Sequence, residues 1–278
     1  MKNSRIFKIG LPLAVLIVGA IGFIMPLLIM VFMALKTPTE IAHSSPWQPP
    51  KEPTLANFGF LLSDPTFNFP RKAFNTLLLC VVPTIGITLS AALTAYPFAR
   101  MKFRCRDKAF ILLLSTMMLP GAITLIPGYV LYAKLGWIDT FYPFLIPAFL
   151  GGGAFNIFLI RQFMLGIPAE MDEAAILDGA SHGRIFSQIL LPNCKPVLAT
   201  IAIFTLVGTA RDFLGPSLIL SSPDRQTIEV GLRGLQTAHT TDWNYLMAGS
   251  LLVFMPVFLM FVFFQKFFMK GIALTGGK

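Results

Sequence analysis

The residues best suited to chemistry lie in a polar segment that separates two long apolar stretches, Pro168 to Pro196. The first part of this segment is acidic, and its centre combines alanines with an Asp-Gly pair. Small side chains such as Ala174 and Ala175 keep a helix surface flat enough for close approach by another protein. The chemistry that this segment predicts is therefore protein binding in water.

Local signals divide the polar segment into two short helices. Pro168 suits a first helical turn, where its missing N–H costs nothing. The pair Asp178-Gly179 predicts a turn, because glycine adopts the left-handed conformation that ends many helices. Ser181 can then cap a second helix. Acidic residues near the first N-terminus are favourable against the helix dipole: Glu170, Asp172 and Glu173.

The second helix has an apolar face, because Ile185, Phe186, Ile189 and Leu190 recur at helical spacing. An alternative is a hairpin that lies on the bilayer. The acidic first half disfavours it, since an inner leaflet with anionic lipids repels negative charge. Docking on a protein is the better interpretation.

Two ionisable residues, Arg211 and Asp212, lie within an apolar stretch that is predicted to span a membrane. Such groups are costly in lipid, so they face a cavity and mark function, or they hold neighbouring helices together. Their side chains point about 100° apart on a helix, which disfavours direct mutual pairing. Asn156, in another predicted span, either lines the same path or cross-links helices. The sequence leaves both roles open for all three residues.

Other chemistries lack their sequence signals. No phosphate-binding G-x-x-x-x-G-K-[ST] motif is present, and nothing follows the terminal TGGK to form its helix. The three histidines have no metal-ligand spacing, and the three cysteines predict neither a disulfide nor a metal site. The net charge of +9 resides in loops that flank apolar spans, which does not favour nucleic acid as a partner. We therefore expect no catalytic residue, no metal and no cofactor in this chain.

The elements that must position these residues are membrane helices. The 278 residues are 55% hydrophobic and only 13% charged, whereas soluble domains carry about 25% charged residues. The apolar run from Ile9 to Leu35 is too long for a cleaved signal peptide. A bilayer core of about 30 Å needs about 20 apolar residues per helix. Six segments qualify: Ile9–Leu35, Phe74–Phe98, Ala109–Tyr132, Tyr142–Phe163, Val197–Leu220 and Leu246–Phe268.

Basic residues near the ends of the spans predict the orientation. The stretch from Arg100 to Lys108 holds five basic residues in nine positions, and both termini are basic. This places both termini and the polar segment in the cytoplasm. The long loops 36–73 and 221–245 then lie outside. Trp47, Trp137 and Trp243 all fall on this outer side, near the ends of spans.

The residues of the polar segment carry a family resemblance. EAA-x-x-DGA at Glu173–Ala180, followed by F-x-x-I-x-LP at Phe186–Pro192, resembles the signature of ABC importer permeases. FNIFLIRQF at Phe155–Phe163, WNYLMAGSLL at Trp243–Leu252 and FFQKFFMKG at Phe263–Gly271 are similar to the carbohydrate-uptake branch. The resemblance covers nearly the whole chain from about Phe74 onward.

The resemblance implies an all-α, polytopic type I importer fold, with residues 1–278 as one permease domain and 74–268 as a five-helix core. Residues 164–196 would form a cytoplasmic coupling loop that inserts into an ATP-hydrolysing subunit. Closure of the ATPase dimer would then switch the permease between inward-facing and outward-facing states. The residues implied in coupling are Glu173, Ala174, Ala175, Asp178, Gly179, Ala180, Phe186 and Ile189.

The implied partners are a second, homologous permease subunit in a heterodimer, two ATP-binding subunits that hold ATP and magnesium, an extracytoplasmic solute-binding protein and a saccharide. The implied location is the bacterial inner membrane. An ion-coupled secondary transporter and a membrane scaffold that recruits a soluble protein are the alternatives. The first predicts internal repeats and midplane acidic sites, and the second does not account for Arg211 and Asp212.

One stretch departs from the family pattern. Related permeases commonly have W-N-D-F-L-x-P where this chain has Ala210 and Arg211 followed by Asp212-Phe213-Leu214 and Pro216. The loss of tryptophan disfavours stacking of a neutral sugar at this site. A guanidinium matches carboxylate and phosphate groups well, so an Arg211 that faces the path would favour an acidic or phosphorylated saccharide over a neutral one. The sequence leaves both substrate classes open.

Overall fold

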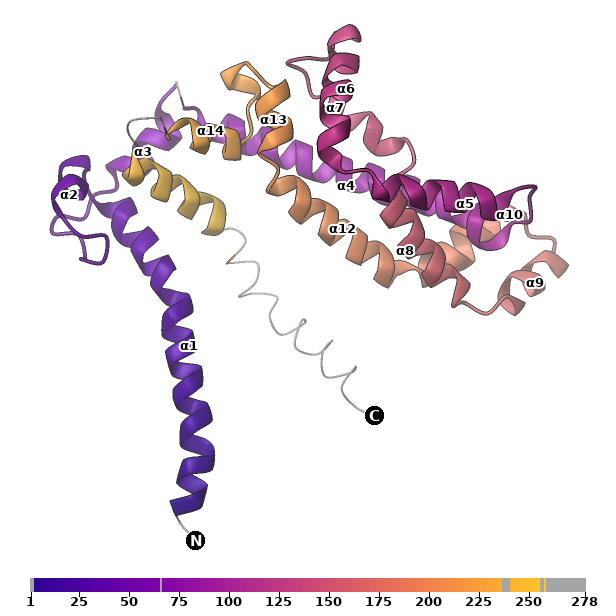
Figure 1. The fold of residues 1–278 in the computed structure, drawn as a ribbon, viewed down its shortest axis with the longest axis horizontal. Helices are drawn as coiled ribbons and strands as arrows, with labels where there is room; N and C mark the ends of the chain where they lie inside the picture. Colours follow the sequence, from indigo (N-terminus) through magenta and orange to yellow (C-terminus); the bar gives the residue numbers. More distant parts are fainter. Residues whose placement is uncertain (1–2, 66, 237–240, 256–257, 259–278) are drawn as a thin grey trace. The chain divides into compact units, whose positions relative to one another are not determined.

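The computed structural model of the chain describes residues 3–65, 67–236, 241–255 and 258. These residues form helices and turns, with one isolated antiparallel bridge between Gln236 and Thr241 and no strand within the described ranges (Figure 1). Contacts divide the chain into two compact units, residues 1–70 with 231–278 and residues 71–230. The predicted all-α class is confirmed for the described part.

The described part of the chain consists of long helices joined by short helical segments and loops. In order, the helices are α1 (Asn3–Leu35), α2 (Pro38–His43), α3 (Ala56–Ser63), α4 (Phe69–Arg100), α5 (Arg106–Ser115), η1 (Thr116–Met118), α6 (Gly121–Lys134), α7 (Tyr142–Leu145), η2 (Pro147–Phe149), α8 (Ala154–Leu165), α9 (Glu170–Leu177), α10 (His182–Arg184), η3 (Ile185–Leu190), α11 (Leu191–Asn193), α12 (Lys195–Ala210), α13 (Leu214–Ile219), η4 (Pro223–Arg225), α14 (Ile228–Gly234) and a final helix, Trp243–Met255.

In the first unit, a buried amide cluster joins α1, α3 and the final helix. Asn57 donates from Nδ2 to the carbonyls of Ala34 and Lys36, at 2.8 and 2.9 Å. Asn244 in turn donates to Asn57 Oδ1 at 2.8 Å. Much of the apolar surface of α1 remains exposed, which suits contact with lipid or with other membrane helices.

In the second unit, the main core lies where α4, α8, α12 and η3 meet. Four alanines of α4, at positions 91, 92, 95 and 99, are buried against Ile160 and Met164 of α8 and Ile201 of α12. In a membrane the hydrophobic effect does not drive helices together. Small residues stabilise helix packing there because they let the backbones approach closely. This packing fixes α4 as the central helix of the unit.

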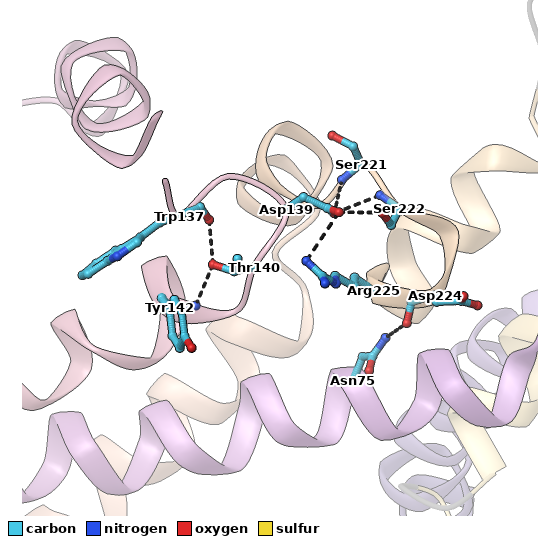
Figure 2. A network of polar contacts seen from close by, with 9 residues as sticks. All are labelled: Asn75, Trp137, Asp139, Thr140, Tyr142, Ser221, Ser222, Asp224 and Arg225. Atoms are coloured by element: carbon cyan, nitrogen blue, oxygen red, sulfur yellow. Dashed lines mark hydrogen bonds and ion pairs between the residues drawn. The ribbon is translucent and has the colours of Figure 1, made fainter. Parts of the chain in front are cut away.

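Asp139 joins two loops of the second unit (Figure 2). Its carboxylate accepts from the backbone N–H groups of Ser221 and Ser222, at 3.0 and 2.9 Å, and from the Ser222 hydroxyl. Arg225 lies 3.5 Å away. Asn75 of α4 donates to the carbonyl of Asp224 at 2.8 Å. The loop after α13 is thereby held by both the loop after α6 and the start of α4.

The described helices differ from the six predicted spans in number. Three segments are long and apolar enough to cross a membrane: Val15–Leu35, Phe69–Arg100 and Tyr142–Leu165. Two bent helix pairs raise this number to at most five. The last predicted span, Leu246–Phe268, is described only as far as Met255 and at residue 258, and its remainder lies outside the described residues. The six-helix count and the cytoplasmic placement of the termini therefore stay predictions.

Three predicted spans are not continuous helices. The segment Ala109–Tyr132 bends by 96° between η1 and α6, where Pro120 forces Leu119 into an extended conformation. The segment Val197–Leu220 begins as α12, which ends at Ala210, and resumes as α13. Pro216 explains this break, because its ring conflicts with a helical carbonyl four residues earlier, at Asp212. The predicted fourth span is interrupted by Gly151–Gly153, all with positive φ.

Candidate functional site

The predicted turn at Gly179 is confirmed, and it closes a compact hairpin, here defined as residues 170–190. Gly179 has a φ of +78°. The Ala180 N–H donates to the Ala175 carbonyl at 2.9 Å, and the Gly179 N–H donates to the Ile176 carbonyl at 3.0 Å. These two bonds form the Schellman motif that ends helices with a left-handed glycine. The direction of the chain after α9 therefore depends on this one residue.

The second half of the hairpin begins as predicted and then departs from an α-helix. Ser181 caps α10, accepting from the Arg184 N–H at 3.4 Å. The following residues 185–190 form a π-helix rather than an α-helix. Pro168 precedes α9, whose first residue is Glu170, and so lies outside the first turn that was predicted for it.

The eight residues predicted for coupling fall into two groups. Four lie on the exposed surface of the hairpin: Glu173, Ala174, Asp178 and Gly179. The other four are half-buried and pack against the core of the second unit: Ala175, Ala180, Phe186 and Ile189. The first group is available to a partner, and the second group holds the hairpin on its own unit.

The exposed surface of α9 also carries apolar residues that the sequence analysis missed. Met171, Ile176 and Leu177 are 42%, 54% and 88% exposed. Their exposure beside Glu173 and Asp178 makes the surface both acidic and apolar. The sequence held a signal for two of them, because Ile176 and Leu177 directly precede the predicted turn at Asp178-Gly179.

Asp172 differs from the other acidic residues of α9, because it is buried. Its Oδ2 lies 2.8 Å from Arg100 Nε at the end of α4. The Tyr96 hydroxyl of α4 also lies 3.0 Å from His182 Nδ1, and the Tyr96 ring contacts Phe186. Sequence reasoning found neither Arg100 nor Tyr96, because both contacts join segments far apart in the chain.

Arg211 and Asp212 lie in the break between α12 and α13, not inside a helix as predicted. Asp212 Oδ1 accepts from the Gly215 N–H at 3.1 Å, so this carboxylate caps the start of α13. Arg211 is exposed, and its guanidinium has no hydrogen bond or ion pair within the described ranges. The two residues do not pair with each other, as expected, although the reason is the cap on α13.

Asn156 lines a groove of about 380 Å³ in the second unit, beside the positive-φ glycines. Its Nδ2 donates to the Gly152 carbonyl at 2.8 Å. Phe144 lines this groove and also a smaller pocket that Asp212 borders. Asn156 and Asp212 thus border neighbouring cavities, whereas Arg211 borders neither of them.

Within the described residues, no group of three or more His, Cys, Asp or Glu side chains could hold a metal ion. Apolar helices around an alanine-lined core, with an exposed hairpin at one end of that core, define the class of an integral membrane subunit. Residues 86–273 match the family described as binding-protein-dependent transport system inner membrane component. The chain belongs to this family, and the resemblance to ABC importer permeases is confirmed.

Relatives over most of the chain carry transport names. The chain is 30% identical to an arabinooligosaccharides transport system permease protein of Halalkalibacterium halodurans, covering 92% of this chain and 91% of the relative. It is 34% identical to a galactooligosaccharides permease protein of Bacillus subtilis, covering 82% of each. It is 32% identical to an sn-glycerol-3-phosphate permease protein of Rhizobium meliloti, covering 74% and 73%.

The fold has a solved counterpart. A bacterial ABC transporter involved in the import of the acidic polysaccharide alginate contains a chain with a TM-score of 0.81 and 22% identity. The match covers 96% of this chain and 98% of that chain. The type I importer fold is thereby confirmed. The chain is a translocation subunit of the bacterial inner membrane rather than an enzyme, and it works with a separate ATPase subunit and a solute-binding protein.

Proposed function

We propose that this chain is one permease subunit of an ATP-driven importer that moves a saccharide across the inner membrane by alternating access. The observation that carries the proposal is the hairpin. It is fixed on the core by Ala175, Ala180, Phe186 and Ile189, while α9 presents an exposed acidic and apolar surface. A surface that is anchored on the core and left uncovered suits a partner that must transmit force.

The docking partner that we propose is an ATP-binding subunit, one of two in the complex. Glu173, Ala174, Asp178 and Gly179 would contact it, together with the exposed Leu177. Residues 164–196 then act as the cytoplasmic coupling loop. The exposed apolar helices of the chain suit packing against a second, homologous permease subunit, which we propose is a different polypeptide.

A saccharide is the proposed substrate, because relatives that match most of the chain are named for oligosaccharide transport. We further propose that Arg211 faces the substrate path. An exposed guanidinium without a partner in the described part is costly in a membrane helix bundle, unless it meets water or an anion. Arg211 thus supports an acidic or phosphorylated saccharide. Asn156 would line the path from α8, whereas Asp212 supports the path as a cap.

Reconstitution of the complex in proteoliposomes tests this function. The probes are labelled maltotriose, an arabinotriose, an alginate trisaccharide and sn-glycerol 3-phosphate, each supplied with the solute-binding protein. We expect uptake of one of them to require internal ATP and to persist with a proton uncoupler. Uptake that an uncoupler abolishes and that ignores ATP would show a secondary transporter instead.

A further inference from the structure

A buried ion pair joins the first turn of α9 to the last residue of α4. Arg100 and Asp172 approach to 2.8 Å, and their side chains are only 10% and 12% exposed. Arg100 Nη2 also donates to the Ile167 carbonyl at 2.8 Å. One guanidinium therefore holds both α9 and the chain segment that enters it.

This pair is not explained by stability alone. Taking both charges out of water costs much of what their attraction returns, so a buried pair is a poor substitute for apolar packing. The geometry here is also incomplete, because Asp172 Oδ1 is buried without a hydrogen-bond partner. A pair that is costly to bury and imperfectly bonded points to a positioning role.

The two halves of the hairpin are attached to the core in different ways. The second half is inserted in it, with Ile185 and Leu190 fully buried. The first half, α9, is mostly exposed, and the residues that it buries toward the core are Ala175 and Asp172, the partner of Arg100. A force on α9 could therefore bend the hairpin at Gly179 or move α4 with it. The ion pair favours the second outcome.

We propose that the Arg100–Asp172 pair is the link through which movement of α9 reaches the membrane helix α4, with Arg100 as a positioning residue for coupled transport. This inference rests on the proposed function, in which an ATP-binding subunit grips α9. Arg100 touches neither substrate nor nucleotide in this account. Its role is to keep the docked helix and the membrane helix moving as one body.

The test compares Arg100→Gln with wild type in the full complex, as molecules of saccharide taken up per ATP hydrolysed. The saccharide is the one that wild type transports best among the four probes above. We expect this ratio to fall about tenfold, a size typical of coupling between sites, while assembly and ATP hydrolysis persist. Arg106→Gln is the matched control, because Arg106 pairs with a neighbouring Asp107 that is 73% exposed. Its ratio should match wild type.

Further variants separate positioning from folding. Asp172→Asn keeps the shape of the side chain, and it should lower the ratio as Arg100→Gln does, with no greater loss in the double variant. Arg100→Lys should recover most of the ratio. Amide hydrogen exchange at residues 171–177 should accelerate in Arg100→Gln, which needs no substrate to observe.

Wild-type ratios in Arg100→Gln or Asp172→Asn would overturn the inference and leave the proposed function intact. Additive losses in the double variant would also overturn it. A wild-type chain that couples to no ATPase would overturn both.

Discussion

Arg211 is the residue on which substrate selection depends in this account. It lies at a helix break that Pro216 and Asp212 create, and its guanidinium is exposed with no partner in the described part. The sequence identified the residue through its charge within an apolar stretch. The sequence could not show that the Asp212 carboxylate accepts a hydrogen bond at the start of α13. This contact depends on where α12 ends, which the sequence did not predict.

Arg211→Gln removes the charge and keeps a polar side chain. We expect the preference for acidic over neutral saccharides to fall by about tenfold, which corresponds to the loss of one charge-assisted hydrogen bond. The measurement is competitive uptake of alginate trisaccharide against maltotriose. Asn156→Ala is the control for a general defect of the path, and it should not alter the charge preference. An unchanged preference in Arg211→Gln would sink the anionic assignment.

Asp139 carries a pH-dependent contribution to stability. The Ser222 hydroxyl, with backbone N–H groups, holds the pKa of this carboxyl below its ordinary value. A lowered pKa means that the carboxylate stabilises the folded chain above the unfolded-state pKa, about 3.9. This contribution is lost as the pH falls through the folded-state pKa.

Asp139→Asn should therefore lower the Tm at pH 7, and the difference from wild type should shrink once the medium is more acidic than the folded-state pKa. Thermal unfolding of the purified protein at several pH values measures both quantities. A Tm difference for Asp139→Asn that stays constant down to low pH would contradict the assignment.

At the scale of elements, the hairpin shows which features local sequence can predict. The turn at Gly179 and the cap at Ser181 follow from residues within one helical turn, and both are confirmed. The break after Ala210 was missed, although Pro216 lies close in sequence, because apolar periodicity continues through it. The Arg100–Asp172 pair could not be predicted, since no local pattern places the end of α4 beside α9.

Gly179→Val should break the hairpin turn. A Cβ at this position meets open space, so the cost comes from the left-handed φ alone, roughly 1–2 kcal/mol for a residue with a side chain. We expect strong loss of ATP-driven uptake by protein present at the wild-type level in the membrane. Gly183→Val is the matched control, because a Cβ at Gly183 also meets open space but the φ of Gly183 is not in the left-handed region. It should retain uptake, and normal uptake by Gly179→Val would refute the role of this turn.

At the scale of the whole molecule, the membrane class and the family followed from composition and from one motif. Low charge content and long apolar runs predict membrane helices whatever their packing. The number of spans was less predictable, because Pro120 and Gly151–Gly153 interrupt apolar runs that look continuous. Contacts within one chain test neither which subunit it pairs with nor which side of the membrane its termini face, so the heterodimer and the orientation stay predictions.

The central claim is that α9 is gripped by a separate ATP-hydrolysing subunit on the cytoplasmic side. A photoreactive amino acid in place of Leu177, which is 88% exposed, tests it in intact membranes. The account predicts a cross-linked product with the ATPase subunit, formed equally in cells whose outer surface has been treated with protease. A product with an extracytoplasmic protein, or efficient labelling with no ATPase adduct, would contradict it.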